Sequence, residues 1–206
     1  MKTTNTIKRL AEIAEIRSGF TFRGKIEEVA EGNAYILQIK DLRKQQSESG
    51  TTLVNHSLLP QVIWEGRAKA LVGPGTVLLP SRGGYFRAAY TKDEATDRPV
   101  IASSQFIIIR PRSTVILPGF LCWSLNRPSM QHYLEEIASQ GTSIAMLSTA
   151  AAKELKLEVP SLETQQKILH LNQLWEQEQQ LTHALLKNRE TMLQGMFQQL
   201  LKEKNT

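Results

Sequence analysis

Two glycine-containing segments carry the side chains in this sequence that are best suited to hydrogen bonding. Residues 17–24 (RSGFTFRG) hold two arginines, two glycines and two aromatic residues, and residues 81–92 (SRGGYFRAAYTK) hold Arg82, Arg87 and Lys92 beside two tyrosines. Residues 140–143 (QGTS) form a third polar segment. Such side chains donate to phosphate oxygens and to base edges in the major groove of DNA, and glycine lets backbone approach a duplex closely. The chemistry predicted is binding of DNA.

Each segment also has a purely structural interpretation. Phe20, Phe22 and Phe86 are apolar enough to belong to a core, and Arg17 and Arg23 are of a type that is commonly solvated on a surface. Composition alone leaves both interpretations open.

The motifs of a nucleotide or metal enzyme are missing. The sequence has no glycine-rich phosphate loop, and its four histidines are scattered without the spacing of metal ligands. The single cysteine, Cys122, excludes an internal disulfide and a cysteine-rich zinc site, and we expect it to be buried. Glu154 and Lys156 superficially resemble part of a nuclease metal site but lack a partner aspartate on a preceding strand. We therefore expect no catalytic centre and no cofactor.

The positive charge is confined to the first part of the chain. Residues 1–161 hold twenty Lys/Arg and fifteen Asp/Glu, whereas residues 162–206 hold five of each, so the formal charge of +5 lies before residue 162. A basic body followed by a neutral segment is typical of a phosphate-binding surface on the body. A moderately basic protein without that function is the alternative.

Composition places the chain among soluble globular proteins. It is 41% hydrophobic and 22% charged, which argues against extensive disorder. No apolar run is long enough to span a bilayer, and the N-terminus lacks the apolar stretch of a signal peptide. We expect a cytoplasmic protein with no membrane partner.

The pattern of short segments predicts an α+β fold, with a β-rich domain and small helices. Apolar spacing indicates a helix over residues 7–16. Residues 148–155, with Ser148 as N-cap, indicate another helix. Further helices are predicted at residues 118–125 and 129–138, and β-branched, turn-bounded runs predict strands at residues 33–39, 51–54, 75–79, 100–102, 105–109 and 157–160.

The last forty-five residues predict a long helix. Only Gly195 interrupts a stretch from residue 162 that lacks other glycines and prolines, and Ser161 is a candidate N-cap. Residues 171, 174, 181, 185 and 192 follow alternate three- and four-residue steps, with Glu178 and Asn188 filling the missing positions. This periodicity favours a coiled-coil helix, and a hairpin of two shorter helices broken near Gly195 is the alternative.

Several segments together resemble the specificity (S) subunits of type I restriction–modification enzymes. Residues 10–22 (LAEIAEIRSGFTF) resemble the start of that family's target recognition domain, and residues 36–42 (ILQIKDL) its next strand. Residues 75–83 (GTVLLPSRG) resemble a strand and loop of the family, with Thr76 where Asp is commoner. Residues 141–168 (GTSIAMLS, then LKLEVPSLETQQKI) resemble its closing motif, with Thr164 where Glu is usual. The order and spacing of these segments cover nearly the whole chain.

The resemblance implies a DNA target recognition domain at residues 1–160 and a conserved assembly helix at residues 161–206. A complete family member has two of each, so this chain is expected to read half of a bipartite site, either as a natural half-length subunit that pairs with a second copy or as a fragment. Implied partners are double-stranded DNA, methyltransferase (M) subunits and a restriction (R) subunit, which would supply all catalysis in phage defence. A regulatory or antirestriction mimic that binds the methyltransferase without reading DNA is the alternative.

The candidate functional residues fall into two sets. Those expected to contact DNA are Arg17, Ser18, Thr21, Arg23, Lys40, Ser81, Arg82, Arg87, Lys92, Gln140, Thr142 and Ser143. Those expected to pair the helix with a second copy in a homodimer are Leu171, Leu174, Leu181, Leu185, Met192, Met196 and Leu200.

Overall fold

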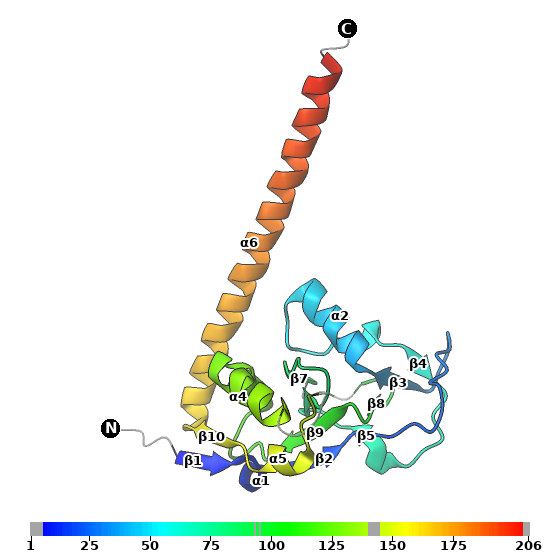
Figure 1. Ribbon diagram of the computed structural model, residues 1–206, viewed down its shortest axis with the longest axis vertical. Coiled ribbons are helices and arrows are strands. Elements are labelled where there is room, and N and C mark those ends of the chain that lie inside the picture. The colour runs from blue at the N-terminus through cyan, green and yellow to red at the C-terminus, as the bar shows by residue number, and fades with distance from the viewer. Residues whose placement is uncertain (1–5, 93, 95, 140–144, 204–206) are drawn as a thin grey trace. The chain divides into compact units, whose positions relative to one another are not determined.

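The computed structural model describes residues 6–92, 94, 96–139 and 145–203 (Figure 1). The chain divides into two units, residues 1–169 and residues 170–206, which are described separately.

The centre of the first unit is an antiparallel four-stranded sheet in the order β2-β9-β6-β7. All of β6 is buried, and Arg110 is the one exposed residue of β9. Leu78 and Ile108 belong to one apolar cluster, whereas Val77 and Ile109 belong to another. The sheet is therefore covered on both faces, which explains the continuous apolar runs in its sequence. Its strands are β2 (Ala14–Ser18), β6 (Val77–Pro80), β7 (Ala89–Tyr90) and β9 (Phe106–Pro111).

A second four-stranded sheet has the order β4-β3-β8-β5. Within it, β3 and β8 are parallel and place Ile36 opposite Ile101, while the other pairs are antiparallel. One apolar cluster combines Leu37 and Ala102 of this sheet with Leu78 and Phe106 of the first, so that the two sheets share a core. The strands are β3 (Ala34–Leu37), β4 (Gln61–Val62), β5 (Leu71–Val72) and β8 (Val100–Ala102).

Small helices cover the first sheet and connect the strands. Phe120 and Leu134 of the helices lie in the same core cluster as Val77 and Ile109. Cys122 is fully buried there, as expected. The helices are α1 (Leu10–Ile13), α2 (Ile39–Ser49), α3 (Pro118–Asn126), α4 (Pro128–Ser139) and α5 (Thr149–Lys153), with 3-10 turns η1 (His56–Leu58) and η2 (Ala68–Ala70).

The ends of this domain pair with each other. Strand β1 (Thr6–Arg9) runs antiparallel to β10 (Lys156–Val159), with Thr6 opposite Val159. The helix predicted over residues 7–16 is consequently wrong except for the single turn of α1. Its apolar spacing is satisfied instead by two strands on either side of that turn, because each strand has a partner far away in the sequence.

Two further predictions are corrected. Residues 36–42 were expected to form a strand, but the strand ends at Leu37 and α2 follows. Gln38 and Asp41 form a capping box at the start of α2, and Gly50 ends it with a φ of 67°. The strand expected at residues 51–54 is reduced to one bridge between Leu53 and Tyr90. The other predicted helices and strands are confirmed, with Ser148 accepting a hydrogen bond from the amide of Ala151.

Helix α6 (Leu162–Glu203) is one continuous helix of 42 residues. The Ser161 hydroxyl accepts a hydrogen bond from the amide of Thr164 at 3.3 Å, which confirms the predicted N-cap. The helix passes through Gly195 without a break, so the hairpin alternative is wrong. At 1.5 Å per residue it is about 60 Å long.

The first turns of α6 are attached to the domain through Gln165, which is fully buried. Its side-chain amide donates to the carbonyl oxygens of Val115 at 3.0 Å and Pro160 at 2.9 Å. Its side-chain oxygen accepts from the amide of Leu117 at 2.9 Å. One side chain thereby satisfies three buried or partly buried backbone groups.

Replacing Gln165 by alanine should destabilise the domain by about 3 kcal/mol, because each buried backbone group left without a partner costs about 1–3 kcal/mol. The adjacent Gln166 is exposed, so Gln166→Ala provides a control with the same change in side chain. Urea unfolding of both variants, followed by circular dichroism, measures the difference. Equal stabilities would contradict an anchoring role for Gln165.

Candidate nucleic-acid interface

Helix α2 packs against the loop between β6 and β7, and both carry exposed basic residues. The Arg43 guanidinium donates to the carbonyl oxygen of Gly83 at 3.4 Å and lies over the ring of Tyr85, 5.5 Å from its centroid. Gly83 and Gly84 have φ values of 92° and 67°, which side chains other than glycine rarely adopt. The glycine pair therefore shapes a loop whose backbone rests against α2.

Further contacts fix the far end of this loop to the same helix. Arg87 donates to the carbonyl oxygen of Gly50, just after α2, at 3.1 Å. Gln46 is buried beneath the loop, and its side-chain amide donates to the carbonyl oxygen of Ala88 at 3.4 Å. The helix and the loop are thus held together from both ends.

The exposed face of α2 is basic. Lys40, Arg43 and Lys44 lie three and four residues apart and therefore share one side of the helix, where all three are exposed. Lys40 forms an ion pair with Glu28 at 2.6 Å, and that hydrogen bond raises the pKa of Lys40 above its ordinary value. In the first turn of the helix, burial raises the pKa of the capping residue Asp41.

We use the name basic loop–helix surface for Arg43, Lys44, Arg82, Tyr85 and Arg87. Arg82 is exposed and Arg87 is half-buried. Arg43 and Lys44 were not predicted from the sequence. Residues 36–42 were interpreted as a strand, so the helix that carries both residues was not recognised. The signal that could have found them is the Gln38–Asp41 capping box followed by Gly50.

The segment around residues 17–24 is built around aromatic packing. The rings of Phe20 and Phe22 lie 4.7 Å and 6.1 Å from that of Trp64, and all three pack against a core cluster of the second sheet. A Cβ atom on Gly19 would lie 2.0 Å from the carbonyl oxygen of Ser103, so glycine is required there. The aromatic residues are structural, while Ser18, Thr21 and Arg23 remain exposed between them.

Arg17 differs from its exposed neighbours. Its guanidinium donates to the carbonyl oxygen of Leu71 at 2.7 Å, and burial lowers its pKa. It lines a cavity of about 400 Å³ together with Glu15 and Arg110. In this position Arg17 links β2 to β5.

The remaining predicted contacts are dispersed. Ser81 is buried, and its hydroxyl donates to the carbonyl oxygen of Gln105 at 2.8 Å, so it is not part of the basic loop–helix surface. Lys92 is exposed and lines a separate cavity of about 490 Å³. Gln140, Thr142 and Ser143 lie outside the described residues.

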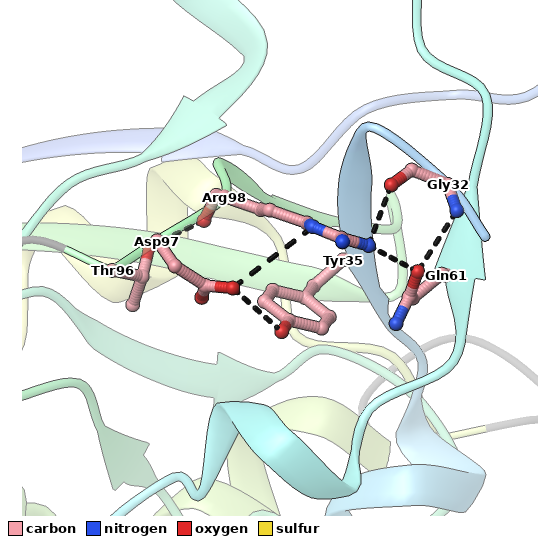
Figure 2. Close-up of polar contacts among 6 residues, drawn as sticks. All are labelled: Gly32, Tyr35, Gln61, Thr96, Asp97 and Arg98. Carbon is pink, nitrogen blue, oxygen red and sulfur yellow. Dashed lines mark hydrogen bonds and ion pairs between the residues drawn. The ribbon is translucent and has the colours of Figure 1, made fainter.

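The cavity at Lys92 adjoins a polar cluster that secures the loop before β8 (Figure 2). Arg98 donates to the carbonyl oxygen of Gly32 at 2.7 Å and to the side-chain oxygen of Gln61. The Tyr35 hydroxyl donates to Asp97 at 3.3 Å. On the cavity wall, burial lowers the pKa of His56. These contacts tie three segments of the second sheet together.

Within the described residues, no group of three or more His, Cys, Asp or Glu side chains is placed to hold a metal ion. Across those same residues, no helix combines the length and apolar character needed to cross a membrane.

Comparison with protein families gives one match over most of the chain. The profile described as "Type I restriction modification DNA specificity domain" matches residues 2–187. The chain is also 28% identical, over 137 residues, to the specificity subunit of the type I restriction enzyme HindI from Haemophilus influenzae; the match covers 64% of this chain and 29% of that subunit.

Solved structures show the same fold. The HsdS subunit from Thermoanaerobacter tengcongensis matches with a TM-score of 0.59 and 20% identity, over 89% of this chain and 40% of that one. A chain from a study of complex assembly and conformational transition in a type I restriction–modification system matches with a TM-score of 0.61 and 18% identity, over 89% of this chain and 41% of that one. The chain thus spans less than half the length of these relatives.

Proposed function

Because the chain belongs to the family of type I restriction modification DNA specificity domains, we propose that it reads one half of a bipartite DNA site and has no catalytic centre of its own. The observation that supports the proposal is the basic loop–helix surface, where Arg43 of α2 contacts a glycine-shaped loop that carries Arg82 and Arg87. Arginine and lysine in such a setting hold phosphates, and arginine also reads guanine edges through paired hydrogen bonds.

The family supports a proposal for the partners of this chain. Methyltransferase subunits and a restriction subunit would carry out methyl transfer and cleavage, directed by the sequence that this chain binds. The exposed leucines of α6 support pairing with a second copy, and two copies joined through α6 would supply two recognition domains. A two-fold pair of identical domains would read two inverted identical half-sites separated by a spacer.

Arg82→Ala and Arg87→Ala should each weaken specific DNA binding by about 1–3 kcal/mol, the cost of a lost base contact. Lys202 lies on α6, away from the basic loop–helix surface in the sequence, and Lys202→Ala should have almost no effect. Affinities are measured by fluorescence anisotropy on a duplex selected from a random pool, with the methyltransferase partner added where it is needed for binding.

Thermal melting of each variant controls for folding, since Arg87 also bonds to the backbone of Gly50. Equal losses at all three positions would show that the wrong surface has been chosen. A chain that binds the methyltransferase but no DNA, with or without that partner, would instead indicate a mimic of the subunit.

A further inference from the structure

The part of α6 beyond residue 169 carries an uncovered apolar stripe. Leu171, Leu181 and Met192 are 66%, 73% and 57% exposed, and Leu174 and Leu185 are exposed as well. The spacing of three and four residues places all five on one side of the helix. Monomeric proteins rarely leave such a stripe open to water, so it needs a covering surface.

The stripe is interrupted by two polar positions. Glu178 and Asn188 occupy the steps between Leu174 and Leu181 and between Leu185 and Met192, and both are exposed on α6. In a helix pair, both would be placed inside the interface. A polar group enclosed there destabilises the pair unless it meets a hydrogen-bonding partner.

An antiparallel second copy matches this pattern in one register. When Leu181 faces Leu185 of the second copy, the same geometry makes Leu174 face Met192 of that copy. Glu178 then faces Asn188 of the second copy, and by symmetry this contact occurs twice. The carboxylate can accept a charge-assisted hydrogen bond from the amide of asparagine.

Other alignments of the two helices do not bring Glu178 opposite Asn188. Sliding one helix by a heptad in one direction places Glu178 opposite Leu181 and Asn188 opposite Leu171. Sliding it the other way places Asn188 opposite Leu185 and Glu178 opposite Gly195. A parallel, in-register pair would place Glu178 against Glu178 of the second copy, and like charges repel.

The flanks of the stripe suit the same register. Ala184, a small residue beside the stripe, would face Ala184 of the second copy next to the two-fold axis, where the helices must approach closely. Leu171 would face Gly195 of the second copy, and a Cβ atom on Gly195 would meet nothing within 4 Å in this chain. On the other flank, Trp175 would lie beside Arg189 of the second copy, a favourable cation–π arrangement.

We propose that the Glu178–Asn188 pair sets the register of an antiparallel α6 homodimer, with Leu181 and Leu185 at its centre. The proposal rests on the homodimer put forward above and specifies which residues of the two copies meet. The occupant of the apolar stripe is a second copy of this chain, because the order of polar and apolar positions is self-complementary under two-fold symmetry.

The test is a double-mutant cycle on the full-length chain with Glu178→Leu, Asn188→Leu and the double variant. The dimer dissociation constant is measured by sedimentation equilibrium. Asn188→Leu should weaken the dimer at least about tenfold, because Glu178 of the other copy then faces a leucine. Adding Glu178→Leu to that variant should restore dimerisation to at least the original strength. The two residues are ten positions apart in one helix, so such coupling would arise between copies.

A second measurement locates the two-fold axis. In a Cys122→Ala background, Ala184→Cys should be joined to its counterpart by a short bifunctional maleimide, whereas Gln180→Cys, on the outer side of the helix, should not. Independent effects of Glu178→Leu and Asn188→Leu in a stable dimer, or cross-linking at residue 180 alone, would overturn the register. A chain that stays monomeric would also overturn it.

The outcomes separate this inference from the proposed function. A monomer that binds a specific half-site would refute the register and leave DNA reading intact. A dimer with the expected coupling that binds no DNA, even with a methyltransferase, would refute DNA reading and leave the register intact.

Discussion

Raising the salt concentration from 50 to 200 mM should weaken binding of the chain to its DNA site by roughly four orders of magnitude. Arg43, Lys44, Arg82 and Arg87 give four cations in each basic loop–helix surface, and a dimer would present two such surfaces. Each phosphate contact releases condensed counterions, and the logarithm of the binding constant falls by about 0.9 per contact for each tenfold rise in salt. Fluorescence anisotropy over a series of salt concentrations gives that slope.

Two double variants identify the cations that cause the salt dependence of DNA binding. Arg43→Ala with Lys44→Ala should reduce its magnitude by about 0.9 for each contact removed. Lys187→Ala with Lys202→Ala removes the same amount of charge from α6 and should leave the slope unchanged. A slope that is flat from the outset would rule out a phosphate-binding surface of this size.

Leu181→Asp together with Leu185→Asp should convert the chain from dimer to monomer at micromolar concentration. In the proposed register these two leucines meet at the centre of the interface, and aspartates there would bring four carboxylates into an apolar contact. Light scattering should show the mass falling by half. Affinity for a site with two inverted halves should fall at least about a hundredfold, because the two domains would then bind independently.

Leu186 provides the matched control for this prediction. It is 60% exposed and adjacent to Leu185, but it lies off the stripe, so Leu186→Asp should leave the mass and the affinity unchanged. A monomeric starting protein, or an unchanged mass in the Leu181→Asp Leu185→Asp variant, would refute the homodimer.

Local signals were enough to predict much of the fold. The buried strands β6 and β9 are continuous apolar sequences between turn residues. Ser148 caps α5 and Ser161 caps α6, and both serines immediately precede the helices they cap. The long helix followed from the absence of breaking residues before Gly195. In each of these cases the information lies within a few neighbouring residues.

The helix predicted over residues 7–16 is wrong because strand pairing with distant segments replaces most of it. Ile7, Leu10 and Ile13 have helical spacing, but hydrogen bonding to segments about 100 residues or more away in the sequence makes strands of most of this stretch. The candidate site was predicted in part for a similar reason. Arg82 and Arg87 were found from loop composition, whereas the contribution of Arg43 depends on where α2 packs.

The pairing of β1 with β10 delays completion of the domain until late in the synthesis of the chain. Thr6 pairs with Val159, and at typical translation rates Val159 is synthesised roughly 10 to 30 seconds after Thr6. Until then β1 is an unpaired edge, a state in which strands are prone to aggregate, and the charges of Lys8 and Arg9 oppose this. Helix α6 leaves the ribosome only after β10, so its apolar stripe emerges when the domain already has all its strands. Nascent chains would therefore complete their domains before they meet a partner, which limits entanglement between copies.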